Sequence, residues 1–123
     1  MLQGTNLNDF TPVEDVTELH KIDLAEGNGD EATTGATVTA HYTGAVASTG
    51  LIFQSSHDFG RAIPFGLNQV IKGWTDGVPG MKVGGIRRLI IPAEQAYGAT
   101  PPPGSGIPPN AALVFDIELV AVN

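Results

Sequence analysis

The sequence predicts an α+β fold, in which a curved antiparallel sheet of about five or six strands wraps around one short helix. Three observations support this class. Short segments that alternate apolar and polar residues follow one another along most of the chain. Turn-forming residues, mostly glycine, separate these segments at short intervals. Only the stretch 70–77 has helical spacing, with Val70 and Trp74 on one face of a single turn.

Composition limits both the architecture and the partners. A length of 123 residues suits one domain, which we divide into a flexible leader, residues 1–15, and a folded domain, residues 16–123. The net charge of −7 argues against nucleic acid as a partner, because phosphate binding needs clustered lysine and arginine. The chain has no cysteine, which excludes disulfides, thiolate catalysis and zinc–thiolate sites.

The sequence contains no apolar run of membrane-spanning length and no signal-peptide pattern after Met1. We therefore expect a soluble, monomeric protein that is cytoplasmic as written. The polar stretch 2–13 would also suit a chain from which an export signal or lipid anchor has been removed, and the protein would then lie outside the cytoplasm.

The N-terminal third predicts two strands. The first covers 16–24 and ends at the turn 27–30. Around this turn Glu26, Asn28 and Asp30 alternate as in a calcium loop, but no flanking helix, following glycine or bidentate glutamate completes the motif. The stretch 37–43 alternates with Val38, Ala40 and Tyr42 on one face, which predicts a half-buried strand.

The middle of the chain leads to the helical turn. Extended structure resumes at 51–53, a polar loop follows at 55–60, and 63–67 is extended again, with Pro64 confining it to a sheet edge or bulge. The turn at 70–77 is too short to be stable alone, so it must be held by packing against the sheet. Within it, we expect Gly73 to leave room beside the indole of Trp74.

The C-terminal third predicts two further strands and a long loop. The strand 86–91 carries Arg87 and Arg88, which we expect at the surface. The loop 93–110 is rich in proline and long enough to suggest a functional role, either beside a site or as a polyproline ligand for another module. The strand 113–121 places Leu113, Phe115, Ile117, Leu119 and Ala121 on one face.

Known catalytic motifs are absent from the sequence. It has no nucleophile elbow and no phosphate-binding loop, and His20, His41 and His57 lack metal-ligand spacing, so we expect no metal and no cofactor. Aromatic residues instead come from separate segments: Tyr42, Phe53, Phe65, Trp74, Tyr97 and Phe115. They could form an ordinary core, or a pocket that accepts a compact apolar ring and offers hydrogen-bond donors at its rim.

Several short motifs of the chain occur in the order and spacing of one enzyme family. They are His41-Tyr42-Thr43-Gly44, Phe53-Gln54-Ser55-Ser56, Val70-Ile71-Lys72-Gly73-Trp74, Gly80-Met81-Lys82-Val83-Gly84, Ala96-Tyr97-Gly98 and the run from Ile107 to Asp116. Together they closely resemble the FKBP-type peptidyl-prolyl isomerases, over roughly residues 16–122. The fold of that family, an antiparallel sheet wrapped around a short helix, agrees with the one that the periodicity predicts.

The resemblance implies a peptidyl-prolyl cis-trans isomerase that acts on X-Pro bonds of unfolded or flexible chains, without covalent, metal or acid–base chemistry. Trp74 would form the floor of the proline pocket. The resemblance gives its walls and rim as Tyr42, Phe53, Phe65, Phe115, Val70, Ile71 and Ile107. It also implies that the backbone N–H of Ile71 and the hydroxyl of Tyr97 donate hydrogen bonds to substrate carbonyls.

Gln54 departs from the family pattern. Many members have an aspartate directly after the phenylalanine that matches Phe53. Glutamine brings no charge, so we expect rapamycin-like macrolides to bind more weakly while isomerisation is retained. Two alternatives stay open: a binding module that holds proline-containing partners with little turnover, and a structural domain whose aromatic cluster is closed.

Overall fold

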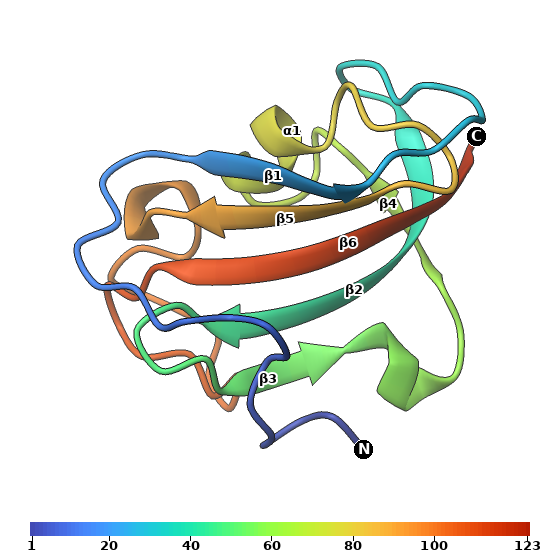
Figure 1. The fold of residues 1–123 in the computed structure, drawn as a ribbon. Coiled ribbons are helices and arrows are strands. Elements are labelled where there is room, and N and C mark those ends of the chain that lie inside the picture. Colours follow the sequence, from blue (N-terminus) through green and yellow to red (C-terminus); the bar gives the residue numbers. More distant parts are fainter.

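The computed structural model describes residues 1–123 and is built on a six-stranded antiparallel sheet. The strands are β1 (His20–Ala25), β2 (Thr37–Val46), β3 (Ile52–Ser55), β4 (Ile63–Gly66), β5 (Ile86–Ile91) and β6 (Leu113–Val122). Their order in the sheet is β1-β5-β6-β2-β3, and β4 also pairs with β2. The helix α1 (Lys72–Gly77) lies on one face of the curved sheet (Figure 1). This arrangement confirms the predicted α+β class.

The sheet is organised around β2 and β6, which pair along most of their length. Their side chains alternate as the sequence predicts: Leu113, Phe115, Ile117 and Leu119 of β6 belong to the main buried cluster. Val38, Ala40 and Tyr42 of β2 belong to the same cluster, as does Trp74 of α1. The core therefore lies between the sheet and the helix, which places Trp74 against the middle of the sheet.

Two glycines let α1 approach β5 closely. A Cβ atom on Gly73 would lie 2.5 Å from side-chain atoms of Ile91, and one on Gly77 would lie 2.8 Å from Leu89. The space beside Gly73 is thus taken by Ile91 of β5. That Gly73 also leaves room beside the indole of Trp74 stays a prediction. The hydroxyl of Thr75 donates to the carbonyl of Leu67 at 2.6 Å and ties the helix to the preceding loop. Tertiary contacts of this kind support a helix of only six residues.

Several predicted boundaries differ from the structure. The strand expected from Val16 begins at His20. All residues of β1 are exposed, and the strand lies at the edge of the sheet. The expected loop 55–60 contains a 3₁₀ turn, η1 (Ser56–Phe59), and a second such turn, η2 (Ala93–Gln95), follows β5. Pro64 lies in β4, which pairs only with β2, as the edge prediction requires.

The two arginines of β5 are buried, so their prediction as surface residues is wrong. Arg87 is 9% exposed and Arg88 is 8% exposed. The strand register sets Arg87 opposite Asp23 and Arg88 opposite Asp116, and each guanidinium Nε lies 2.7 Å from the facing carboxylate. A charged side chain can be buried in the protein when it is paired and hydrogen-bonded in this way. The hydrogen bond that Arg88 donates to Asp116 also raises the pKa of Arg88 above its ordinary value.

The leader lies against the sheet. In Figure 1 the dark-blue segment runs beside β3, on the side of the sheet away from α1. Leu7 is buried with Ala45, Ile52 and Val114 in a small cluster separate from the main core. The sequence interpretation set this segment outside any core, and its single buried leucine differs from that. The flexibility assigned to residues 1–15 stays a prediction.

None of the helices has the length and apolar character needed to cross a membrane.

Candidate active site

An apolar cavity of about 530 Å³ opens on the inner side of the sheet beside α1. Side chains from β2, β3, β4, β6, α1 and the loop after β5 form its lining. These residues are Tyr42, Phe53, Gln54, Phe65, Gln69, Val70, Ile71, Trp74, Tyr97 and Phe115. The aromatic residues are therefore not a closed core, and the structural-domain alternative, which requires one, loses its support.

Trp74 is the centre of the aromatic cluster. Only 4% of its surface is exposed, and its ring lies edge-to-face with three neighbours. The centroid distances are 4.8 Å to Phe65, 5.5 Å to Phe115 and 5.8 Å to Tyr42. Edge-to-face pairs favour defined ring orientations, so the indole is held at the base of the cavity in one position.

Gly44 makes room for two of the walls. Phe53 and Phe115 meet at a centroid distance of 5.8 Å with nearly perpendicular rings. A Cβ atom on Gly44 would lie 2.7 Å from both rings, closer than real contacts allow. The glycine of the His41-Tyr42-Thr43-Gly44 motif therefore has a steric role in the shape of the site.

The cavity combines this apolar lining with free hydrogen-bond donors. The N–H of Ile71, just before α1, donates to no acceptor of the protein. The hydroxyls of Tyr42 and Tyr97 also have no protein partner, and both residues line the cavity. The Tyr42 hydroxyl is not fully buried, and Tyr97 is an exposed residue. Burial, and secondarily the nearby Tyr97, raise the pKa of Tyr42. Its hydroxyl is thus a protonated donor at neutral pH.

The lining contains no carboxylate, imidazole, thiol or amine, and its only ionisable groups are the hydroxyls of Tyr42 and Tyr97. His41 and His57 stack on each other at 4.2 Å elsewhere, and His41 points away from the face that carries Tyr42, as predicted. No group of three or more potential metal ligands occurs in the structure. A second hollow, of about 160 Å³, is lined by charged residues including Asp23, Glu26, Lys82 and Arg87, which do not suit an apolar ring.

All the predicted site residues except Ile107 line the aromatic cavity. Ile107 packs against the main core from the long loop without contributing to the lining. Gln69 lines the cavity and was missed by the sequence reasoning. Its only signal was its position directly before Val70 in the predicted helical turn. With Gln54 it gives the rim two uncharged amides.

A curved antiparallel sheet that holds an uncharged aromatic cavity over one short helix is the arrangement that the resemblance to the peptidyl-prolyl isomerases implied, and it suits a reaction that needs no nucleophile. The model of the family described as FKBP-type peptidyl-prolyl cis-trans isomerase matches residues 29–120, and the chain belongs to this family. It is accordingly a peptidyl-prolyl cis-trans isomerase of the FKBP type.

Named relatives and a solved structure agree with this assignment. An FK506-binding protein of Streptomyces anulatus is 47% identical over 116 residues, which cover 93% of this chain and 94% of that protein. A peptidyl-prolyl cis-trans isomerase of Saccharomyces cerevisiae is 50% identical over 94 residues, covering 75% of this chain and 69% of that protein. The crystal structure of a peptidyl-prolyl cis-trans isomerase from Pseudomonas syringae pv. tomato superimposes with a TM-score of 0.76 and 36% identity, covering 85% of this chain and 75% of the other.

Proposed function

We propose that the aromatic cavity binds the proline ring of X-Pro segments in unfolded or flexible polypeptides, with Trp74 as its floor. Tyr42, Phe53, Phe65 and Phe115 form the walls. The observation that supports this most directly is the lining itself, which is apolar and uncharged but includes donors without protein partners. Such a site suits a compact ring that is flanked by carbonyl groups.

The same cavity accounts for catalysis without reactive groups. Rotation about the X-Pro amide meets a barrier of ~18–20 kcal/mol, which comes from the double-bond character of the C–N bond. The twisted transition state loses amide resonance, so its carbonyl oxygen carries less charge than in the ground state. A dry apolar site therefore favours the transition state over the planar amide, which lowers the barrier.

Hydrogen bonds at the rim would hold the substrate in a turned geometry. We assign the N–H of Ile71 and the hydroxyl of Tyr97 as donors to substrate carbonyls on either side of the reacting bond. Each lines the cavity and lacks a protein acceptor. Fixing both sides selects conformers that are close to the twisted state.

The assay that tests this function follows cis-trans relaxation of a peptide with a central Leu-Pro bond, without a coupling protease. Acceleration by the protein supports the isomerase mechanism. Binding, seen as a change in Trp74 fluorescence, without acceleration would support the binding module. Tyr97→Phe should lower kcat/KM about three- to tenfold, the value of one neutral hydrogen bond. An unaltered rate would remove Tyr97 from the mechanism.

We also propose that macrolides of the FK506 type occupy this cavity, with affinity reduced by Gln54. The name of the Streptomyces anulatus relative supports the ligand class. Gln54 lines the cavity and is exposed at its rim, where a carboxylate would accept a charge-assisted hydrogen bond from a ligand hydroxyl. Gln54→Asp should tighten macrolide binding in a fluorescence titration, and equal affinity for the two proteins would contradict the assignment.

A further inference from the structure

The first residues of the chain extend the sheet beyond β3. The N–H of Gly4 donates to the carbonyl of Ile52 at 2.9 Å, and the N–H of Ile52 donates to Thr5 at 2.8 Å. The N–H of Leu7 then donates to Gly50 at 2.8 Å. These bonds form one antiparallel bridge, Asn6–Leu51, directly before β3, so the first residue of the strand, Ile52, is held by β2 on one side and by residues 4–7 on the other.

A carboxylate holds the start of this segment. Asp58, in the η1 turn directly after β3, accepts hydrogen bonds from the N–H groups of Leu2 at 2.6 Å and Gln3 at 2.9 Å. These two bonds lower the pKa of Asp58. The leader is therefore attached near both ends of β3. It bonds to Gly50 and Ile52 where the strand begins, and to Asp58 just after the strand ends.

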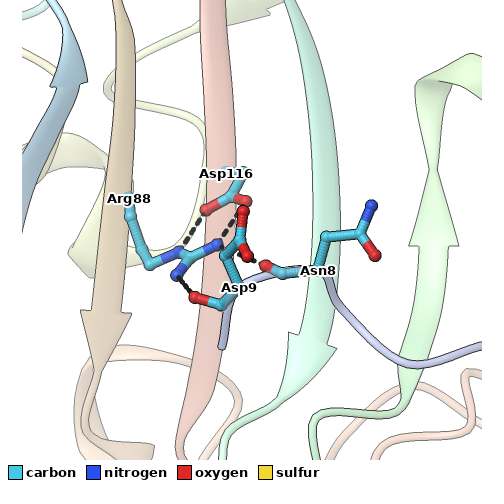
Figure 2. Close-up of polar contacts among 4 residues, drawn as sticks. All are labelled: Asn8, Asp9, Arg88 and Asp116. Carbon is cyan, nitrogen blue, oxygen red and sulfur yellow. Dashed lines mark hydrogen bonds and ion pairs between the residues drawn. The ribbon is translucent and has the colours of Figure 1, made fainter. Parts of the chain in front are cut away.

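A buried guanidinium holds the other end. Arg88 forms a two-point pair with Asp116, at 2.7 and 2.9 Å, and donates two further hydrogen bonds to the carbonyls of Asp9 at 2.7 Å and Asn8 at 3.0 Å (Figure 2). The ring of Phe10 covers the guanidinium, with Cζ 5.5 Å from the ring centroid. The leader carbonyls thus supply two of the four hydrogen bonds of a side chain that has little access to water.

An apolar contact joins the leader to β3 between these two ends. Leu7 is 8% exposed and packs with Ile52, Ala45 and Val114 on the outer face of the sheet. The next residue after Ile52 is Phe53, which lines the aromatic cavity on the inner face, followed by Gln54. The residue that contacts Leu7 is thus the direct chain neighbour of the first of two site residues.

β3 is anchored to β2 mainly at its C-terminal end, where the hydroxyl of the buried Ser55 bonds to the hydroxyl of Thr43 at 2.9 Å, and its first residues lack side-chain bonds of this kind. It pairs with β2 at Thr43–Ser55, Gly44–Gln54 and Ala45–Ile52 only, and the register shifts within this short ladder. We propose that residues 2–10 form a strap that positions the Phe53–Gln54 wall of the active site, with Leu7, Asp58 and Arg88 as positioning residues. This inference rests on the proposed function of the cavity. None of these three residues lines the cavity itself.

The test uses the full chain with Leu7→Ala and Asp58→Ala, each compared with a matched control. The controls are Leu24→Ala, which truncates a leucine that is 50% exposed on β1, and Asp30→Ala, which removes an exposed carboxylate far from the strap. Kinetics of the Leu-Pro peptide are measured at a temperature where circular dichroism shows every variant fully folded. A mispositioned wall should raise KM about three- to tenfold, less than the ~10²-fold that larger misplacement can cause, with a smaller change in kcat.

The possible results distinguish the strap proposal from the proposed function of the cavity. Raised KM in both strap variants, normal KM in both controls and recovery in Leu7→Ile support the positioning role. If the strap variants only lose thermal stability and keep the KM of their controls, the leader is a structural element and the inference fails. If the unaltered protein does not accelerate the peptide, the proposed function fails, and the strap as a device of that site fails with it.

Discussion

The two faces of the sheet hold their covering segments by different forces. On the inner face, α1 is held by close packing, with Gly73 against Ile91 and Trp74 among three aromatic rings. On the outer face, the leader is held mainly by backbone hydrogen bonds, by the carboxylate of Asp58 and by the bonds that Arg88 donates to leader carbonyls. The inner face should therefore respond to changes of volume, and the outer face to changes of charge and pH.

The largest effect should come from the inner face. Trp74→Ala removes the aromatic centre of the core, and we expect the free energy of unfolding to fall by ~3–5 kcal/mol, the usual cost of such a truncation. Isomerase activity should be lost as well, because the cavity loses its floor. Urea unfolding followed by circular dichroism measures the stability, and activity is measured where the variant is folded. A stability loss under about 1 kcal/mol would show that the site is not integral to the core.

The outer face should show the next largest effect when its ion pair is broken. Arg88→Met leaves the carboxylate of Asp116 partly buried without its partner, and we expect a loss of about 2–3 kcal/mol. The double variant Arg88→Met/Asp116→Leu removes both charges and should regain much of that stability. A double variant as unstable as the sum of the two single variants would mean that the pair itself contributes little.

A smaller effect is expected where α1 touches β5. Gly73→Ala forces a methyl group against Ile91, and overpacking of this kind costs ~1–3 kcal/mol. The double variant Gly73→Ala/Ile91→Val shortens the side chain that the new methyl group meets. Its loss in free energy of unfolding should be smaller than the sum for the two single variants, because both changes affect the same contact. Chemical denaturation of all three variants measures this coupling, and strict additivity would show that Ile91 does not limit the approach of the helix.

The smallest expected effect is the response of the leader to acid. The N–H groups of Leu2 and Gln3 lower the pKa of Asp58, so the folded state favours its ionised form. The resulting stabilisation is present above the ordinary aspartate pKa and is lost as pH falls through the lower folded-state value. The amide NMR signals of Leu2 and Gln3 should shift in that range while those around Trp74 stay constant. The same shifts in Asp58→Asn would rule out Asp58 as their cause.

The inner face was largely predictable from the sequence, and the outer face was not. Period-2 alternation in β2 and β6 identifies the buried side chains directly, and the spacing of Val70 and Trp74 identifies the helix. Arg88 was misjudged because its partners lie 28 residues later, at Asp116, and 80 residues earlier, at Asn8. Side-chain type alone favours the surface for arginine, and only the strand register reveals the pair.

The remaining differences at the site have a similar cause. Gln69 and Ile107 both lie outside regular elements, where no periodicity indicates the direction of a side chain. Leu7 is the one apolar side chain between Gln3 and Asp9, so its burial leaves no periodic pattern in the sequence. In each of these places tertiary geometry decides the outcome, and local sequence carries little information about it.

Gly44 also limits how this site could be redesigned. Its backbone is extended and unstrained, so the position would accept other residues in an ordinary strand. Here the two rings of Phe53 and Phe115 pack directly over Gly44, and even the Cβ of alanine would lie 2.7 Å from both. A library randomised at position 44 and selected for ligand binding should therefore return glycine, unless one of the two phenylalanines is made smaller at the same time.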